Sequence, residues 1–200
     1  MDVNKSKITD VFNGTRQYVI PFFQRAYVWW KEQWERLLID MEHVSEVQRQ
    51  HFLGSIILKQ QTTSSNAQIG DLRTIIDGQQ RLTTLAIFFK VFCLKTAQLD
   101  SFNRNFRNLR NALVLRHGRS DVDAFKLVME QTEAVEIKNT TPTSQIISAF
   151  NYFVKKIEPD KLHMQTIKQN VQFVCIDLLE GEDEQQVFDK ANHIDEIKEV

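Results

Sequence analysis

Residues 75–85 have the sequence IIDGQQRLTTL, in which an apolar run stops at a polar turn and a helical pattern begins. The run that ends at Ile76 is short and rich in β-branched residues, as buried strands are. After the turn, apolar residues recur at steps of three and four: Leu82, Leu85, Ala86, Phe89 and Cys93. That spacing is typical of a helix with one apolar face. The stretch therefore predicts a strand, a turn and a helix.

The turn lies where the predicted helix begins. The first backbone N–H groups there have no partner within the helix, and the positive end of the helix dipole lies at the same place. Both properties suit a phosphate group. Gly78 lacks a Cβ that would keep a ligand from the backbone, and Gln79 and Gln80 add amide donors. The guanidinium of Arg81 can bind two phosphate oxygens at once. The two threonine hydroxyls are suited to a phosphate or a metal-bound water. The residues predicted to bind phosphate here are Gly78, Gln79, Gln80, Arg81, Thr83 and Thr84.

A purely structural interpretation of the same turn is open. Asp77 is a good helix N-cap, Gly78 is a common turn residue, and Arg81 could pair with a surface carboxylate.

A second string of unusual composition, IPFFQRAYVW, occupies residues 20–29. Gln24 and Arg25 are the polar groups of this otherwise aromatic stretch. One interpretation is that the aromatic rings are core and that Arg25 extends to water. The other is that Arg25 supplies a second cation to an anion held at Gly78, while Tyr27 or Trp29 offers a ring face to a base.

The two strings resemble motifs of the N-terminal domain family of GmrSD-type restriction enzymes. Residues 77–85 match the family's DGQQRLTTL, and residues 20–29 match every fixed position of its Ile-Pro-x-Phe/Tyr-Gln-Arg-x-Tyr-x-Trp element. Residues 51–56 and 188–192 are similar to further family elements. The resemblance implies an α+β fold related to ParB and sulfiredoxin, in which a small mixed sheet packs with helices and a mainly helical region follows. We expect a nucleotide-binding core at 1–98, a helical region at 99–169, and a returning strand and terminal helix at 170–200.

The function that this resemblance implies is nucleoside triphosphate binding and hydrolysis, coupled to DNA recognition in a modification-dependent restriction or phage-defence protein. The expected enzyme class is an NTPase, with Mg²⁺ as cofactor. Its expected partners are DNA, in modified form, and a nuclease domain or subunit. A homo-oligomer is compatible with the sequence. The alternative is a non-catalytic DNA- or partner-binding module of the same fold.

The resemblance also implies roles for particular residues. The triphosphate is expected at residues 78–81, with Arg25 as a second clamp and Asp77 positioning Mg²⁺ or the attacking water. Phosphoryl transfer needs mainly positioning and charge neutralisation, so Asp77 and Arg81 are the predicted catalytic residues. Asn192 either closes the pocket or caps a helix. The remaining predicted nucleotide ligands of the first string are Gln24, Arg25 and Tyr27.

Five arginines further along the chain are the predicted contacts to a DNA backbone. Arg104, Arg107 and Arg110 are three residues apart, which on a helix places them on one broad face. Arg116 and Arg119 follow with no acidic residue between them. Each phosphate that such a face neutralises adds salt-dependent affinity. A solvated helix face without a ligand is the alternative.

Composition sets limits on the other classes of function. The net charge of −1 gives no global attraction to nucleic acid, so DNA binding requires a local patch. No apolar run reaches the ~20 residues of a membrane span, and the start of the chain is too polar for a signal peptide, so a cytoplasmic protein is expected. Cys93 and Cys175 are predicted to be reduced and buried. The histidines are scattered, and neither a metal site nor a nuclease motif is predicted. Residues 193–200 do not continue the family's pattern, so the chain is expected to be either an N-terminal portion or a truncated product.

Several secondary-structure predictions follow from periodicity. Helices are expected at 8–12, 31–48, 81–97 and 121–135, and another opening at Thr141-Pro142. Strands are expected at 17–20, 51–59, 71–76 and 171–178. The second and third of these strands are expected to pair antiparallel, and Gly54 marks a place where another group approaches the second strand closely.

Overall fold

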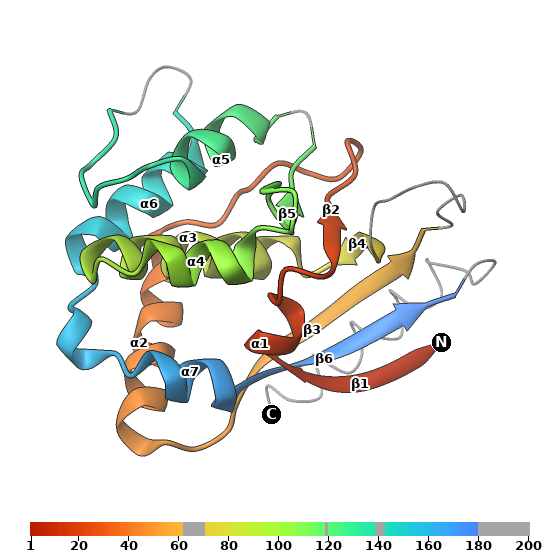
Figure 1. Cartoon of the computed structure of the whole chain (residues 1–200), viewed down its shortest axis with the longest axis horizontal. Coiled ribbons are helices and arrows are strands. Elements are labelled where there is room, and N and C mark those ends of the chain that lie inside the picture. Colours follow the sequence, from red (N-terminus) through yellow and green to blue (C-terminus); the bar gives the residue numbers. More distant parts are fainter. Residues whose placement is uncertain (62–70, 119, 139–142, 180–200) are drawn as a thin grey trace.

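The computed structural model describes residues 1–61, 71–118, 120–138 and 143–179. Within these ranges, one six-stranded sheet packs with helices (Figure 1). The strands are β1 (Asp2–Lys7), β2 (Gln17–Val19), β3 (His51–Gln60), β4 (Leu72–Asp77), β5 (Leu115–Arg116) and β6 (Val171–Leu178). The α-helices are α1 (Ile8–Val11), α2 (Lys31–Val47), α3 (Gln79–Lys95), α4 (Leu99–Phe106), α5 (Val122–Met129), α6 (Gln145–Lys156) and α7 (Met164–Asn170). A 3₁₀ turn, η1, covers Pro159–Lys161. The predicted α+β class is confirmed.

The sheet is mixed, with the strand order β1-β6-β3-β4-β2-β5. β1 is antiparallel to β6 and β3 is antiparallel to β4, as predicted for the second pair. The pairs β3–β6, β2–β4 and β2–β5 are parallel. Figure 1 shows the first strand and the last one side by side at one end of the sheet. The three neighbours β4, β2 and β5 therefore run in one direction, and the segments that follow them leave the sheet at the same edge.

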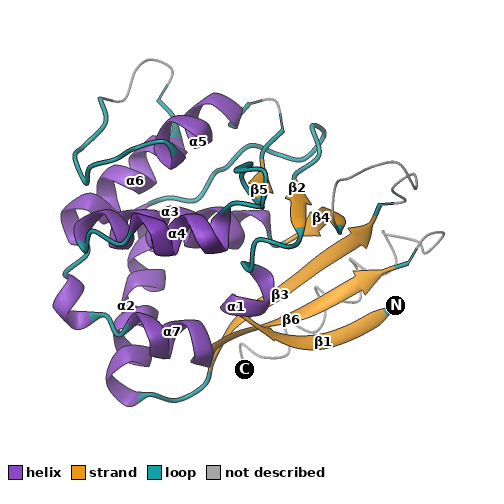
Figure 2. Cartoon of the chain, viewed as in Figure 1, coloured by secondary structure: helices purple, strands orange, loops and turns teal. Residues whose placement is uncertain are grey.

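The main core lies between one face of the sheet and the helices gathered beside it (Figure 2). Strand residues alternate between the two faces, as the two-residue period requires. Ile56 and Leu58 of β3 face the main core, whereas Ile57 belongs to a small cluster on the opposite face with Ile176 and Leu178 of β6. The central helix is α3, in which Arg81 is the sole residue between positions 79 and 93 that is not buried. This burial exceeds the single apolar face that its sequence predicts.

Phenylalanine rings fill the centre of the core. The rings of Phe102 and Phe106 of α4 stack at 4.5 Å with an interplanar angle of 6°, and Phe12 stacks on Phe106 at 4.5 Å. Lys90 of α3 is buried and places its Nζ 5.0 Å from the centroid of the Phe102 ring, a cation–π contact. The thiols of Cys93 and Cys175 are free and buried, as predicted.

Most predicted elements are confirmed, and the exceptions have identifiable causes. β1 was not predicted because it is a polar edge strand, mostly exposed, with no alternation of apolar residues. The helix predicted at 121–135 is wrong beyond Met129, where α5 ends. Further on, Ile137 binds the Asn151 side-chain amide through both its N–H and its C=O. α6 begins at Gln145, where Ser144 caps it. The predicted opening at Thr141-Pro142 lies outside the described residues. No helix in the described ranges is long and apolar enough to cross a membrane.

The predicted arginine face is wrong in its geometry. α4 ends at Phe106, and Arg107 is already in extended conformation. Asn108 folds the next residues into a turn, in which its Oδ1 accepts from the N–H groups of Arg110 and Ala112. The Arg107 guanidinium binds Glu130 Oε1 at 2.9 Å, and Arg116 belongs to β5. Arg104, Arg107 and Arg110 therefore do not share one helix face, and Arg119 lies outside the described residues.

The stacked phenylalanines give a direct test of this core. Phe102→Ala is expected to lower the free energy of unfolding by about 3–5 kcal/mol, since it removes a fully buried ring. Phe22→Ala is the matched control, because that ring is 76% exposed, and we expect a change within about 0.5 kcal/mol. Urea denaturation of both variants measures the difference. Equal effects would contradict the assignment of Phe102 to the core.

Candidate functional site

The strand–turn–helix prediction is confirmed, with Gly78 as the residue between β4 and α3. Gly78 has φ +94°, in the left-handed region that favours glycine, and it is the N-cap of α3. An added Cβ would lie 2.6 Å from Cγ2 of Ile56. The backbone conformation and the packing on β3 therefore both require a glycine here. Gly78 also lines the pocket described below, so its expected role in letting a ligand approach the backbone stays a prediction. Asp77 is not the N-cap as expected, because Gly78 occupies that position and has no side chain to accept a capping hydrogen bond.

The helix's own hydrogen bonds begin with the Leu82 N–H, which donates to the Gly78 carbonyl at 3.1 Å. The N–H groups of residues 79–81 consequently have no acceptor inside the helix. Together with the dipole of a 17-residue helix, they give this end a positive potential.

Glutamine side chains attach residues 20–29 to this helix end. Gln79 Nε2 donates to the Arg25 carbonyl at 3.1 Å. Gln80 binds twice, because its Oε1 accepts from the Val28 N–H at 2.9 Å and its Nε2 donates to the Ala26 carbonyl at 3.1 Å. The amide donors that were expected to bind phosphate are thus engaged with backbone, and they hold the two motifs together.

Gln24 has a corresponding role toward the sheet. β2 pairs with β4 only as far as Val19 and Thr74, so beyond these residues β4 has no strand on its β2 side. Gln24 Nε2 donates to the carbonyls of Ile75 and Ile76 at 2.7 and 2.9 Å. The side chain replaces the missing strand, because unpaired buried carbonyls are costly.

The two motifs line one pocket of about 450 Å³. Its walls are Gln24, Arg25, Trp29, Ile76, Asp77, Gly78, Gln79, Gln80 and Arg81. The convergence follows from the sheet, since β2 and β4 are parallel neighbours and both segments leave it at one edge. The Arg25 side chain is exposed, and no described residue forms an ion pair or hydrogen bond with it. The structure thus brings Arg25 and Arg81 to the same pocket.

Arg81 lies against β3 at a bulge in that strand. Its Nη2 donates to the Ser55 carbonyl at 2.5 Å and is 3.5 Å from Asp77 Oδ2. A Cβ on Gly54 would be 3.0 Å from the Arg81 guanidinium carbon, so Gly54 leaves the room in which this group lies. The predicted close approach at Gly54 is confirmed. Arg81 Nε is buried without a hydrogen-bond partner among the described residues, so its N–H is left for a ligand or water.

The predicted ligands Tyr27, Thr83 and Thr84 are buried behind the pocket and do not line it. The Trp34 Nε1–H donates to the Tyr27 hydroxyl at 2.8 Å, and that hydroxyl is 2.6 Å from Thr84 Oγ1. Thr84 Oγ1 donates to the Gln80 carbonyl at 2.7 Å, so the Tyr27 hydroxyl donates to Thr84. Burial raises the pKa of Tyr27. Of the two aromatic residues proposed to face a base, Trp29 is the one at the pocket.

A buried histidine that the sequence did not single out contacts Thr83. His117 Nε2 is 3.1 Å from Thr83 Oγ1, and its Nδ1 is 3.9 Å from Asp121 Oδ2. Burial lowers the pKa of His117 to about 3, so the ring is neutral at pH 7. Burial also raises the pKa of Asp121, an effect that its hydrogen bond from the Tyr27 N–H opposes.

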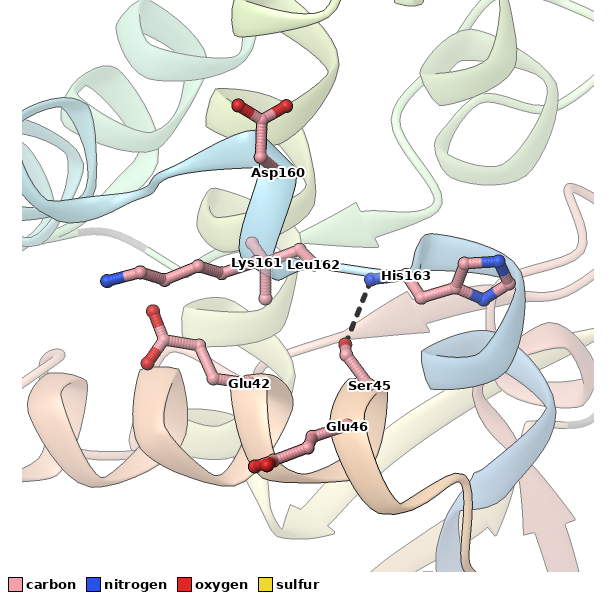
Figure 3. Close-up of a pocket in the computed structure, with 7 residues that line it drawn as sticks. All are labelled: Glu42, Ser45, Glu46, Asp160, Lys161, Leu162 and His163. Carbon is pink, nitrogen blue, oxygen red and sulfur yellow. Dashed lines mark hydrogen bonds between the residues drawn. The ribbon is translucent and has the colours of Figure 1, made fainter.

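A second pocket, of about 470 Å³, lies between α2 and η1 (Figure 3). Figure 3 shows Glu42 and Glu46 on α2, with Asp160 and Lys161 on η1, and the His163 N–H donating to Ser45 Oγ at 2.9 Å. Carboxylates outnumber the single ammonium group there, which disfavours a phosphate. By charge, the pocket at Arg25 and Arg81 is the candidate anion site.

The structure does not bring every predicted residue to this pocket. Arg104 lies on α4, Arg110 in the turn after that helix, and Arg116 on β5. Asn192 lies outside the described residues. In the described ranges, no three His, Cys, Asp or Glu side chains form a group that could hold a metal ion. The sequence did not mark four further residues of this region: Ser55 and Ile76, which act through backbone or shape, and His117 and Asp121, which belong to neither motif.

The buried histidine predicts a dependence of stability on pH. In the unfolded chain His117 takes up a proton near pH 6.5, whereas in the folded protein it does so only near pH 3. Stability from this group is therefore complete above pH 6.5 and falls as the pH drops toward 3, by about 1 kcal/mol per pH unit. His117→Gln does not titrate, so the difference in unfolding free energy between wild type and variant should shrink from pH 7 to pH 4.5. Urea denaturation at several pH values measures it, and a constant difference would contradict the assignment.

Residues 8–194 match the model of one protein family, described as the N-terminal domain of the GmrSD restriction endonuclease. No curated protein matches the chain.

Proposed function

The chain belongs to the family of GmrSD restriction endonuclease N-terminal domains and is thereby related to restriction and phage defence, and on that premise we propose that its pocket binds and hydrolyses a nucleoside triphosphate. The observation that carries the proposal is the convergence of Arg25, Arg81 and the beginning of α3 on one pocket. The charged side chains of its walls are two guanidinium groups and the carboxylate of Asp77. The net positive charge and the helix end both favour phosphate oxygens.

The size and the lining of the pocket fit a nucleotide. A volume of about 450 Å³ is within the range of small-molecule sites. Trp29 supplies an aromatic face on which a base can stack, while Arg25 and Arg81 supply fork-shaped donors for the phosphates. Gln24, Gln79 and Gln80 hold the backbone of the two walls, so their contribution to binding is to keep the arginines in place.

Asp77 fits a role with Mg²⁺. This ion is commonly held by one or two carboxylates together with the phosphates of the substrate, and Asp77 is the carboxylate in the pocket wall. When bound, Mg²⁺ neutralises charge on the phosphates. We propose that Arg81 adds positive charge where negative charge develops and that Asp77 also orients the attacking water. The contact between Asp77 and Arg81 keeps the two groups in a fixed relation.

The family's connection with restriction supports a DNA-directed role, and we propose that DNA recognition, including recognition of modified bases, controls nucleotide turnover together with a nuclease domain. Arg104, Arg110 and Arg116 remain proposed DNA contacts from separate elements, whereas Arg107 is already paired with Glu130. A DNA oligonucleotide that changes the rate of phosphate release would support this control.

Arginine variants test the nucleotide site. Arg25→Ala and Arg81→Ala are each expected to weaken binding by about 10- to 100-fold, the value of a hydrogen bond between charged groups. Arg49→Ala, which removes an exposed arginine away from the pocket, should bind like the wild type. Isothermal titration with ATP, GTP and CTP in the presence of Mg²⁺ measures affinity.

Phosphate release separates chemistry from binding. Asp77→Asn is expected to lower the rate of release by at least about tenfold and to change affinity less, because the amide keeps the shape and loses the charge. Circular dichroism controls for folding of Arg81→Ala, which loses its bond to Ser55. Absence of binding by the wild type to all three nucleotides would reject the proposal.

A further inference from the structure

A third segment lies behind the pocket, and its position follows from the sheet. β5 is the parallel neighbour of β2, so the residues after β5 leave the sheet at the edge where residues 20–29 and 78–81 also lie. His117, Gly118 and Asp121 belong to this segment. Together with Gln24 and Arg25 they line a cavity of only about 10 Å³, too small to hold a water molecule comfortably. The first motif and the segment after β5 are thus in direct contact.

Gly118 permits this contact. A Cβ at this position would lie 3.0 Å from the Cα of Phe22 and 3.0 Å from the carbonyl oxygen of Pro21. Both of these atoms belong to the backbone, so a larger residue would force the first motif to move.

Asp121 makes the polar connection between the two segments. Its Oδ2 accepts from the Tyr27 N–H at 2.7 Å, and its side chain is only 17% exposed. His117, with one nitrogen near that same oxygen and the other at Thr83 Oγ1, connects the segment to α3. Arg25 lies two residues before Tyr27, and its own guanidinium has no partner in the described part of the chain. Its position is therefore set by its backbone, through Gln79 on one side and Asp121 on the other.

We propose that Asp121 is a positioning residue of the nucleotide pocket, which fixes the backbone at Tyr27 and thereby holds Arg25 toward the phosphates. This inference rests on the proposed function. Asp121 does not line the pocket, so we expect its effect to pass through the segment that it holds, chiefly through Arg25. Loss of the hydrogen bond should therefore cost affinity only as long as Arg25 is present.

A double-mutant cycle tests this dependence. Asp121→Ala is expected to weaken binding of the nucleotide found in the titrations by about tenfold, because a misplaced clamp loses most of its contribution. In the Arg25→Ala background the same change should weaken binding less than about twofold. Asp121→Asn keeps an acceptor oxygen and should remain within about twofold of the wild type. Asp123→Ala, which removes an exposed carboxylate nearby, is the matched control. Equal effects of Asp121→Ala with and without Arg25 would overturn the proposal.

Hydrogen exchange provides a readout that needs no nucleotide. In Asp121→Ala the amides of residues 24–28 should exchange at least about tenfold faster, with no such change in α3, and Asp121→Asn should restore protection. Unchanged exchange overturns the proposal whatever the binding data. If the wild type binds no nucleotide, the proposed function fails, while the exchange result still decides whether Asp121 holds this segment. If Asp121→Ala does not fold, Asp121→Ser, whose shorter side chain holds its oxygen farther from the Tyr27 N–H, takes its place in the cycle and in the exchange experiment, with the same expected results.

Discussion

Amide side chains hold the two motifs of this protein together. Gln24 binds the carbonyls at the end of β4, while Gln79 and Gln80 bind the backbone of residues 25–28. All of these groups are wholly or partly removed from water, where an unpaired donor or acceptor costs about 1–3 kcal/mol. A segment rich in aromatic residues is therefore fixed at the end of a short strand without any further sheet pairing. The arginine that it carries reaches the pocket because the glutamines fix the backbone on both sides of the site.

The location of the pocket is a consequence of strand direction. β4, β2 and β5 are parallel neighbours, and the residues that follow them meet at one edge of the sheet. Sheets of this kind commonly bind ligands outside the carboxyl ends of their strands. The segment after β5 carries no motif that marks it as part of a binding site. It contributes Asp121 and His117, which contact the other two segments behind the pocket.

The sequence predicted the features that depend on local pattern. The strand at 171–178, the antiparallel pairing of β3 and β4, and the turn at Gly78 follow from periodicity and turn residues, whereas the α+β class was implied by the family resemblance. What it could not predict depends on partners far along the chain. The sequence around Gln80 reads the same whether its side chain binds a phosphate or the backbone of Ala26 and Val28. Only the fold decides between these two partners. Similarly, the spacing of Arg104, Arg107 and Arg110 is helical, but the side chain of Asn108 favours a turn.

The placement of β6 between β1 and β3 has a consequence for how this chain folds during its synthesis. β3 is complete once residue 60 has left the ribosome, but its parallel partner is not made until residues 171–178 emerge. Until then, one edge of β3, with Ile56, Ile57 and Leu58, has no strand to pair with. Parallel pairing over such a long sequence separation is slow, and open apolar edges attract other chains. The nascent protein therefore passes through a stage at which a chaperone that covers extended apolar segments would be of most use.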